Sequence, residues 1–333
     1  CEVGHEAMVR LLLDEGGDIN TATRFQDAGA DRHANITALY AACGNNHMAI
    51  VRLLLDAGAD IEAGYASATY HATPLHRACN YQHGTDEGCE TIKLEIVQLL
   101  LEKGANVKAT NHMGQTPLHL ASRSDRLTCE DMIRLLLQAG ADIETPDNAG
   151  LRPLHTASVN GAKHAVRALL EAGGSTGANI RNDWTALHCA CLCSHSANRQ
   201  AVVSLLLEAG CDINALTSFG YTPLHFACQE NHSNCARLLV SAGCNTTLHN
   251  NDGETALETA EHNGHEELVQ ELRPLIKAAN KKRRKNAQKA RRQQQQQAAA
   301  AAATAVAAAA DASAEPEPEL ELEVMRASQG DVQ

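Results

Sequence analysis

The stretch TPLHLAS at residues 116–122, followed by MIRLLLQAGADIE at residues 132–144, decides the fold. Thr and Pro suit the first turn of a helix, because Thr can cap free N–H groups and Pro lacks an N–H that would stay unbonded there. Leu and Ala then face inward, and the LLL run supplies the apolar side of a second helix. The Gly that follows is the usual helix stop. The stretch therefore predicts two short helices and a turn.

The same pair of motifs recurs along the chain. The first motif begins at residues 37, 73, 116, 152, 185, 222 and 255, so that successive starts lie 36, 43, 36, 33, 37 and 33 residues apart. The second recurs, for example, as IVRLLLDAGADIE at 50–62 and VVSLLLEAGCDIN at 202–214. One such unit cannot bury its apolar face alone. Stability must therefore come from stacking of the units.

With the T-P-L-H-x-A signature on a basic period of 33 residues, the chain resembles the ankyrin-repeat family. The resemblance covers residues 1–279 and implies an all-α solenoid of helix-turn-helix units joined by β-turns. Residues 1–20 form a truncated first repeat in this interpretation, because they align with residues 46–62 and place Cys1 opposite Cys43. We therefore expect the chain to begin inside a first helix, as a fragment would. Polar residues before Pro274 predict a cap that closes the array at its C-terminal end.

Departures from the period of 33 lengthen particular loops, at residues 21–36, 63–72, 80–95, 123–130 and 192–200. Long loops in compact arrays are often functional. Surface insertions also cost little free energy, so drift explains them equally well. The sequence leaves both interpretations open.

The family resemblance implies that a partner protein binds to the turn tips and to the inner face of the first helices. Eight of the nine aromatic residues fall at such tips, in extended turns or on the first helices, and Tyr40 takes the place of the motif histidine. Exposed aromatic side chains are favoured anchors for partners. The candidate binding residues are Tyr81, His112, Met113, Arg123, Asn148, Arg181, Trp184, Phe219, Tyr221, Phe226, Gln229 and Glu230.

Composition excludes several classes of protein. Residues 1–280 carry 19 basic and 33 acidic side chains, which disfavours general nucleic-acid binding. No stretch is apolar enough to cross a bilayer. Twelve cysteines in a chain of this length predict reduced thiols rather than a disulfide framework. We expect a cytoplasmic or nuclear monomer.

Catalytic and metal-binding patterns are weak. The histidines at the fourth motif position (His76, His119, His155, His188 and His225) are interpreted as structural. Cys189, Cys191, Cys193 and His195 form the one cluster that resembles a metal site, but their spacing is wrong for paired CxxC ligands, and buried packing explains them better. No nucleophile elbow, phosphate loop or HExxH motif occurs. We predict no enzyme activity, no cofactor and no small-molecule substrate for this chain.

Residues 280–333 change in composition to a basic run, then a Gln- and Ala-rich run, then an acidic segment. Such a tail cannot bury a core, so we expect it to be disordered or at most locally helical. The basic run, which includes Lys281, Lys282, Arg283, Arg284 and Lys285, is typical of a nuclear-import signal, a nucleic-acid contact or a solvated helix extension.

These patterns together predict a non-catalytic adaptor that binds another protein. The alternative is that the array is the substrate-recruiting or regulatory region of a larger enzyme whose catalytic domain lies upstream of Cys1. The sequence does not name the partner, because arrays that share a scaffold differ at the positions that determine choice.

Overall fold

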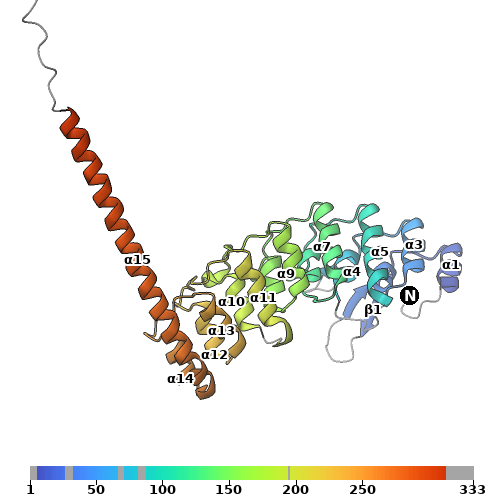
Figure 1. Ribbon diagram of the computed structural model, residues 1–333. Helices are drawn as coiled ribbons and strands as arrows, with labels where there is room; N and C mark the ends of the chain where they lie inside the picture. The colour runs from blue at the N-terminus through green and yellow to red at the C-terminus, as the bar shows by residue number, and fades with distance from the viewer. Residues whose placement is uncertain (1–5, 27–32, 67–70, 82–87, 194–195, 313–333) are drawn as a thin grey trace, which may run out of the picture. The chain divides into compact units, whose positions relative to one another are not determined.

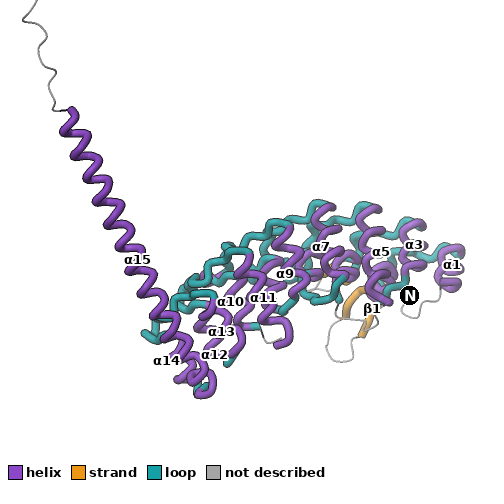
Figure 2. Tube along the Cα trace, viewed as in Figure 1, coloured by secondary structure: helices purple, strands orange, loops and turns teal. Residues whose placement is uncertain are grey.

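The computed structural model describes residues 6–26, 33–66, 71–81, 88–193 and 196–312. Its repeats lie side by side in chain order from α1 to α14 (Figure 1). Each repeat places a short first helix against a second helix, and helices dominate the described chain (Figure 2). The expected all-α solenoid of stacked repeats is confirmed. The first helices are α2 (Ala38–Gly44), α4 (Pro74–Cys79), α6 (Pro117–Ala121), α8 (Pro153–Val159), α10 (Ala186–Leu192), α12 (Pro223–Gln229) and α14 (Ala256–His262).

The second helices carry the LLL runs and alternate with the first helices along the chain. In the runs of α7 and α11 the middle leucine, Leu136 or Leu206, is fully buried, while the leucines on either side of it are partly exposed. The core is therefore a thin continuous layer between helices rather than one large cluster. The second helices are α1 (Glu6–Asp14), α3 (Met48–Asp56), α5 (Gly88–Glu102), α7 (Thr128–Gln138), α9 (Lys163–Glu171), α11 (Ser196–Glu208), α13 (Ser233–Ser241) and α15 (Glu266–Ala312).

A glycine in the left-handed conformation follows the second helices from α1 to α13. At α7, the Gly140 N–H donates to the Leu137 carbonyl and the Ala141 N–H to the Leu136 carbonyl, both at 3.0 Å. Gly140 has a φ of +91°, and an added Cβ would meet nothing within 4 Å, so its backbone angle alone accounts for glycine there.

The motif histidines join each repeat to the next. In the repeat of α6, the Thr116 N–H donates to His119 Nδ1 at 3.1 Å, while His119 Nε2 lies 3.0 Å from the Leu151 carbonyl of the following turn. Because a backbone N–H can only donate, Nδ1 is the acceptor and Nε2 carries the proton. The same Thr-to-His contact occurs at His76, His188 and His225.

Burial makes these rings poor bases. It lowers the pKa of His76, His155 and His188 to about 4, and it lowers the pKa of His119 and His225 as well. In four of them, a second proton would also break the hydrogen bond that Nδ1 accepts from the threonine N–H. The five histidines are therefore neutral structural groups at neutral pH.

We predict that stability falls as the pH drops from about 6.5 to about 4. The unfolded chain takes up protons at the ordinary histidine pKa of about 6.5, whereas the folded chain does so only near 4, so acid favours unfolding by up to about 3 kcal/mol for each such ring. Urea denaturation at a series of pH values would measure this. His188→Gln should flatten the dependence, and His249→Gln at an exposed histidine should not. A stability that stays constant across this range would contradict the prediction.

One repeat lacks the threonine cap. Arg152 stands at the N-cap of α8 and makes no side-chain cap bond, and the buried Nδ1 of His155 has no hydrogen-bond partner among the described residues. The Arg152 guanidinium instead lies 3.4 Å from the partly exposed Glu144 carboxylate, a contact of small energetic value.

We predict that Arg152→Thr raises the free energy of unfolding by about 1 kcal/mol, because the new hydroxyl supplies the missing cap and a partner for His155. Chemical denaturation would give the difference. Arg152→Val has the same shape as the Thr variant without the hydroxyl. Equal stability of the Thr and Val variants would show that the cap contributes nothing.

Two of the lengthened turns pair as strands. β1 (Thr23–Gln26), β2 (His33–Ile36), β3 (Tyr65–Ala66) and β4 (His71–Ala72) form an antiparallel sheet in that order. The extra length of these turns was predicted from the sequence but their pairing was not, since strands of two to four residues are too short for a periodic signal. The backbone N–H of His112 donates to the His71 carbonyl at 3.2 Å, which links the sheet to the next turn.

The chain divides into two units at Ile276 and Lys277. Helix α15 runs through Pro274 and extends to Ala312, so the expectation of a disordered or at most locally helical tail is corrected for residues 280–312. Ala, Gln, Lys and Arg are all strong helix formers, which favours a helix even without a core. Residues 313–333 lie outside the described part, as does Cys1 with its expected position in a first helix.

Candidate partner-binding surface

The turn tips are joined to one another by backbone hydrogen bonds. The Asn148 N–H donates to the Met113 carbonyl at 2.9 Å, and the Asn251 N–H donates to the Phe219 carbonyl at 3.0 Å. Asn or Asp side chains shape several tips, as where Asn111 Oδ1 accepts from the Gln115 N–H at 2.9 Å. The tips therefore present side chains from a backbone that is already held in place.

Several predicted tip residues point outward. Met113 is 50% exposed and Phe219 is 55% exposed, and Leu216 beside that tip is 47% exposed. Asn148 and Arg181 are also exposed, and the Arg181 guanidinium donates to the Asn148 carbonyl at 3.4 Å. Leu216 was not among the predicted residues, because its position in the turn carries no aromatic or motif signal.

Of the four aromatic candidates in the later repeats (Trp184, Phe219, Tyr221 and Phe226), three lie in contact with one another. The Trp184 and Phe226 rings lie 4.5 Å apart between centroids, and the Tyr221 and Phe226 rings lie 5.4 Å apart. Phe226 is only 7% exposed, so its assignment as an exposed contact residue is wrong. Trp184 and Tyr221 cover it from neighbouring turns and thereby remove it from water. Gln229 and Glu230 follow at the end of α12; Gln229 is half-buried and Glu230 is exposed.

A hollow of about 240 Å³ opens between the first helices and the extended turn at residues 63–72. Tyr40, Arg77 and Arg123 line it from the helix side, and Tyr65 and Met113 from the turns. Three of the predicted binding residues, His112, Met113 and Arg123, thus lie together in the wall of this hollow. Sequence reasoning missed Arg77. The available signals were the lengthened turn and the tyrosine that replaces the motif histidine.

Tyr81 lies in a second, adjoining hollow of about 190 Å³, whose walls share Asn80 and Arg123 with the first. Its hydroxyl forms a hydrogen bond of 3.2 Å with the Thr128 hydroxyl, and the Lys93 ammonium lies 5.2 Å from its ring centre. Burial raises the pKa of Tyr81. Tyr81 is therefore a partly buried wall residue rather than a free tip.

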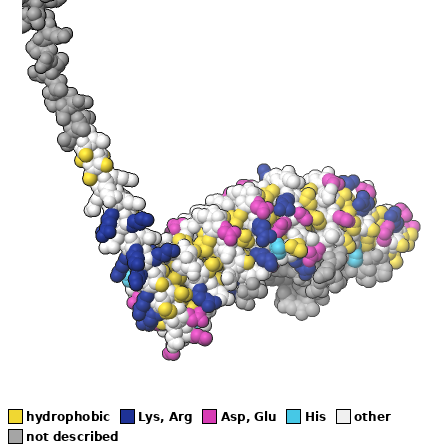
Figure 3. Space-filling model, in the orientation of Figure 1, with side chains coloured by type: hydrophobic (Ala, Val, Ile, Leu, Met, Phe, Trp, Pro, Cys, Tyr) yellow, Lys and Arg dark blue, Asp and Glu magenta, His cyan; other side chains and the backbone are white. Residues whose placement is uncertain are grey.

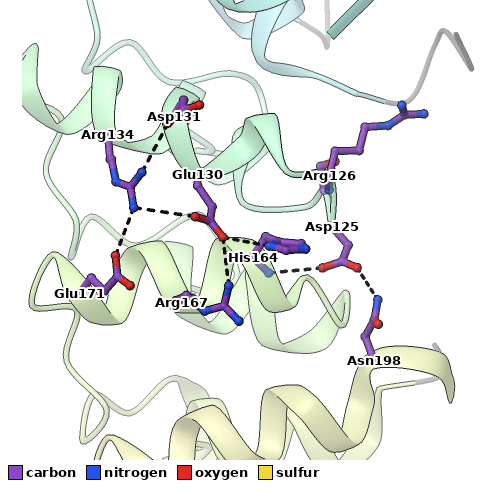
Figure 4. A network of polar contacts seen from close by, with 10 residues as sticks. Asp125, Arg126, Glu130, Asp131, Arg134, His164, Arg167, Glu171 and Asn198 are labelled. Atoms are coloured by element: carbon purple, nitrogen blue, oxygen red, sulfur yellow. Dashed lines mark hydrogen bonds and ion pairs between the residues drawn. The ribbon is translucent and has the colours of Figure 1, made fainter. Parts of the chain in front are cut away.

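A polar network joins the second helices at one edge of the array (Figure 4). The Glu130 carboxylate lies 2.8 Å from His164 Nδ1 and 3.4 Å from the Arg167 guanidinium. Asp125 accepts from the His164 backbone N–H and from the Asn198 amide, so that it links α9 to α11 across one repeat. Each carboxylate in this network already has cationic or N–H partners from the protein. The network is better suited to fixing neighbouring helices than to catalysis.

The cysteine cluster is buried. Cys189, Cys191 and Cys193 are at most 3% exposed, and Cys189 and Cys191 are free thiols. Burial raises the pKa of Cys189 to about 12 and raises that of Cys191 well above its ordinary value. Such thiols stay protonated at neutral pH, which suits packing and disfavours nucleophilic chemistry. His195 lies outside the described residues, and no cluster of His, Cys, Asp and Glu suited to a metal is found among those described.

Stacked helix pairs with a linked row of turn tips define a helical-repeat scaffold. A family model for ankyrin repeats (3 copies) matches residues 1–92, 88–147, 130–217 and 196–285. The chain belongs to the ankyrin-repeat family. No curated protein matches the sequence. Within the described residues, no helix is both long and apolar enough to span a membrane.

Proposed function

We propose that the chain is a non-catalytic interaction module that binds a protein partner across its turn tips and the inner face of its first helices. Ankyrin repeats generally mediate protein–protein interaction. The observation that carries the proposal is the exposure of Met113, Leu216 and Phe219 on tips whose backbone is held by the ladder of hydrogen bonds. Apolar side chains presented on a rigid frame lose little entropy on binding.

We predict that Phe219→Ala combined with Leu216→Ala weakens capture of the partner by about tenfold or more, because exposed apolar anchors contribute strongly to binding. Stability should change by less than about 0.5 kcal/mol, because both side chains are largely in water. Pull-down from the source cell with quantitative mass spectrometry would measure the enrichment, and thermal unfolding would check the fold.

Leu127→Ala is the matched control, since Leu127 is 70% exposed at the N-cap of α7, away from the tips. A protein that the wild-type chain and the control enrich, and the double variant does not, supports the proposal. Equal enrichment by all three chains would remove these tips from the interface.

We also propose that Lys281–Lys285 act as a nuclear-import signal, which would place the protein in the nucleus for part of its time. All five side chains are exposed, and Lys and Arg gather along the same part of α15 (Figure 3).

A fluorescent reporter carrying residues 275–295 should accumulate in the nucleus. The same fusion with Lys281, Lys282, Arg283, Arg284 and Lys285 replaced by Gln should stay distributed as the reporter alone is. Microscopy of both fusions tests this. An equal distribution of the two fusions in the cell would contradict the assignment.

A further inference from the structure

The hollow between the extended turn and the first helices has a composition unlike the rest of the array. We call it the arginine pocket and define it by Tyr40, Tyr65, Arg77, Met113, Leu120 and Arg123. Its other described wall residues are neutral or histidine, and no Asp or Glu is among them. The chain as a whole has a net charge of −12, so an acid-free wall with two guanidinium groups stands out against its surroundings.

Arg77 is held in a fixed place in this wall. Its guanidinium carbon lies 5.7 Å from the centre of the Tyr40 ring, which itself packs 6.0 Å from the Tyr65 ring. A Cβ at Gly44 would come within 2.1 Å of Arg77 Nε, so the side chain lies directly against that glycine. The buried Nε has no hydrogen-bond partner in the described chain. The guanidinium is thus positioned on an aromatic face, and its Nε is left without an acceptor in the described chain.

The replacement of the motif histidine explains why Tyr40 is available for this wall. In the repeat of α2, the Thr37 hydroxyl itself donates to the Ala63 carbonyl of the following turn at 2.8 Å. The bond that a histidine Nε2 makes elsewhere is therefore replaced by threonine. The ring at position 40 is released from that contact and forms part of the pocket instead.

Elsewhere on the array, arginines are commonly matched with carboxylates. Arg126 pairs with Glu90, Arg167 with Glu130, and Arg273 with Glu261. By contrast, no carboxylate of the described residues forms an ion pair with Arg77 or Arg123. An anion that enters this pocket would therefore meet two arginines and no competing carboxylate in its described wall.

We propose that the arginine pocket binds an acidic peptide segment of a partner protein, in which a Glu or Asp stands beside an aliphatic residue. A guanidinium binds a carboxylate through two parallel hydrogen bonds. Tyr65, Met113 and Leu120 supply the apolar surface for the neighbouring side chain. The volume of about 240 Å³ is below that of ordinary small-molecule sites, which suits single side chains of an extended peptide. This inference rests on the proposed interaction function and names one part of its surface.

The test uses the full chain and a fluorescein-labelled peptide of sequence Ser-Leu-Glu-Leu-Glu-Leu-Ser, followed by fluorescence anisotropy. The dissociation constant should rise at least about tenfold for Arg77→Gln and for Arg123→Gln, because each leaves a carboxylate without its partner. It should also rise with salt concentration. A peptide with Gln in place of both Glu should bind at least about tenfold more weakly to the wild-type chain.

Arg52→Gln is the matched control, because it removes the same charge from an exposed position on α3, outside the pocket wall. Gly44→Ala gives a second, independent variant. It displaces the Arg77 guanidinium while keeping its charge, so it too should weaken binding. Thermal unfolding of each variant separates loss of binding from loss of fold.

Equal affinity of the wild-type chain for the Glu and Gln peptides would overturn the proposal. So would an equal loss of peptide affinity in the Arg52→Gln and Arg77→Gln variants. The chain also carries an acidic Glu-Leu segment of its own at residues 315–323. If neutralising Glu315, Glu317, Glu319, Glu321 and Glu323 to Gln tightens peptide binding tenfold, the occupant is that segment and the assignment to a partner is wrong. The Phe219 and Leu216 variant tests the wider interaction function at other repeats, so the two proposals can fail separately.

Discussion

The bond from a motif histidine to the carbonyl of the following turn holds each repeat in register with the next. The same ring accepts a hydrogen bond from the threonine that begins its own helix, as at Thr116 and His119. One neutral imidazole therefore satisfies a helix N-terminus and an interface between repeats at the same time. Because both contacts are buried and directional, a repeat cannot shift along its neighbour without losing them.

The exceptions to this pattern show how the chain adjusts to a missing histidine. Where Tyr40 replaces it, the Thr37 hydroxyl reaches the next turn directly. In the repeat of α14, Glu258 replaces it and accepts from the Thr255 N–H at 2.7 Å, so the helix cap is kept. Among the described motif histidines, only His155, in the repeat where Arg152 replaces the threonine, has an unsatisfied Nδ1. The motif histidine can therefore be replaced by another residue when a different group makes its hydrogen bonds.

The hydrogen bonds of the motif threonine and histidine also determine which parts of the surface can vary. Thin layers of Leu and Ala leave little space for large rings, so most aromatic side chains lie at the turns or beside the arginine pocket, and Phe226 on α12 is covered by rings from the turns. Insertions are tolerated where they leave the threonine and histidine contacts intact. The network around Asp125 and Glu130 then ties the lengthened loops to the second helices. The array can vary its edges and tips while its stacking stays unchanged.

The sequence by itself determined the repeat, because the Thr-Pro-Leu-His motif acts locally. The helix starts, glycine stops and structural histidines follow from residues close together in the chain. The exposure of Met113 and Phe219 was also foreseen, since both lie at turn tips. The length of α15 was not, because composition alone does not distinguish an isolated helix from a disordered tail. Only the tertiary structure decided that Phe226 is covered by Trp184 and Tyr221, and that Arg77 joins Arg123 in one pocket. Such contacts depend on how side chains from different repeats meet across a turn, and no spacing within one repeat encodes them.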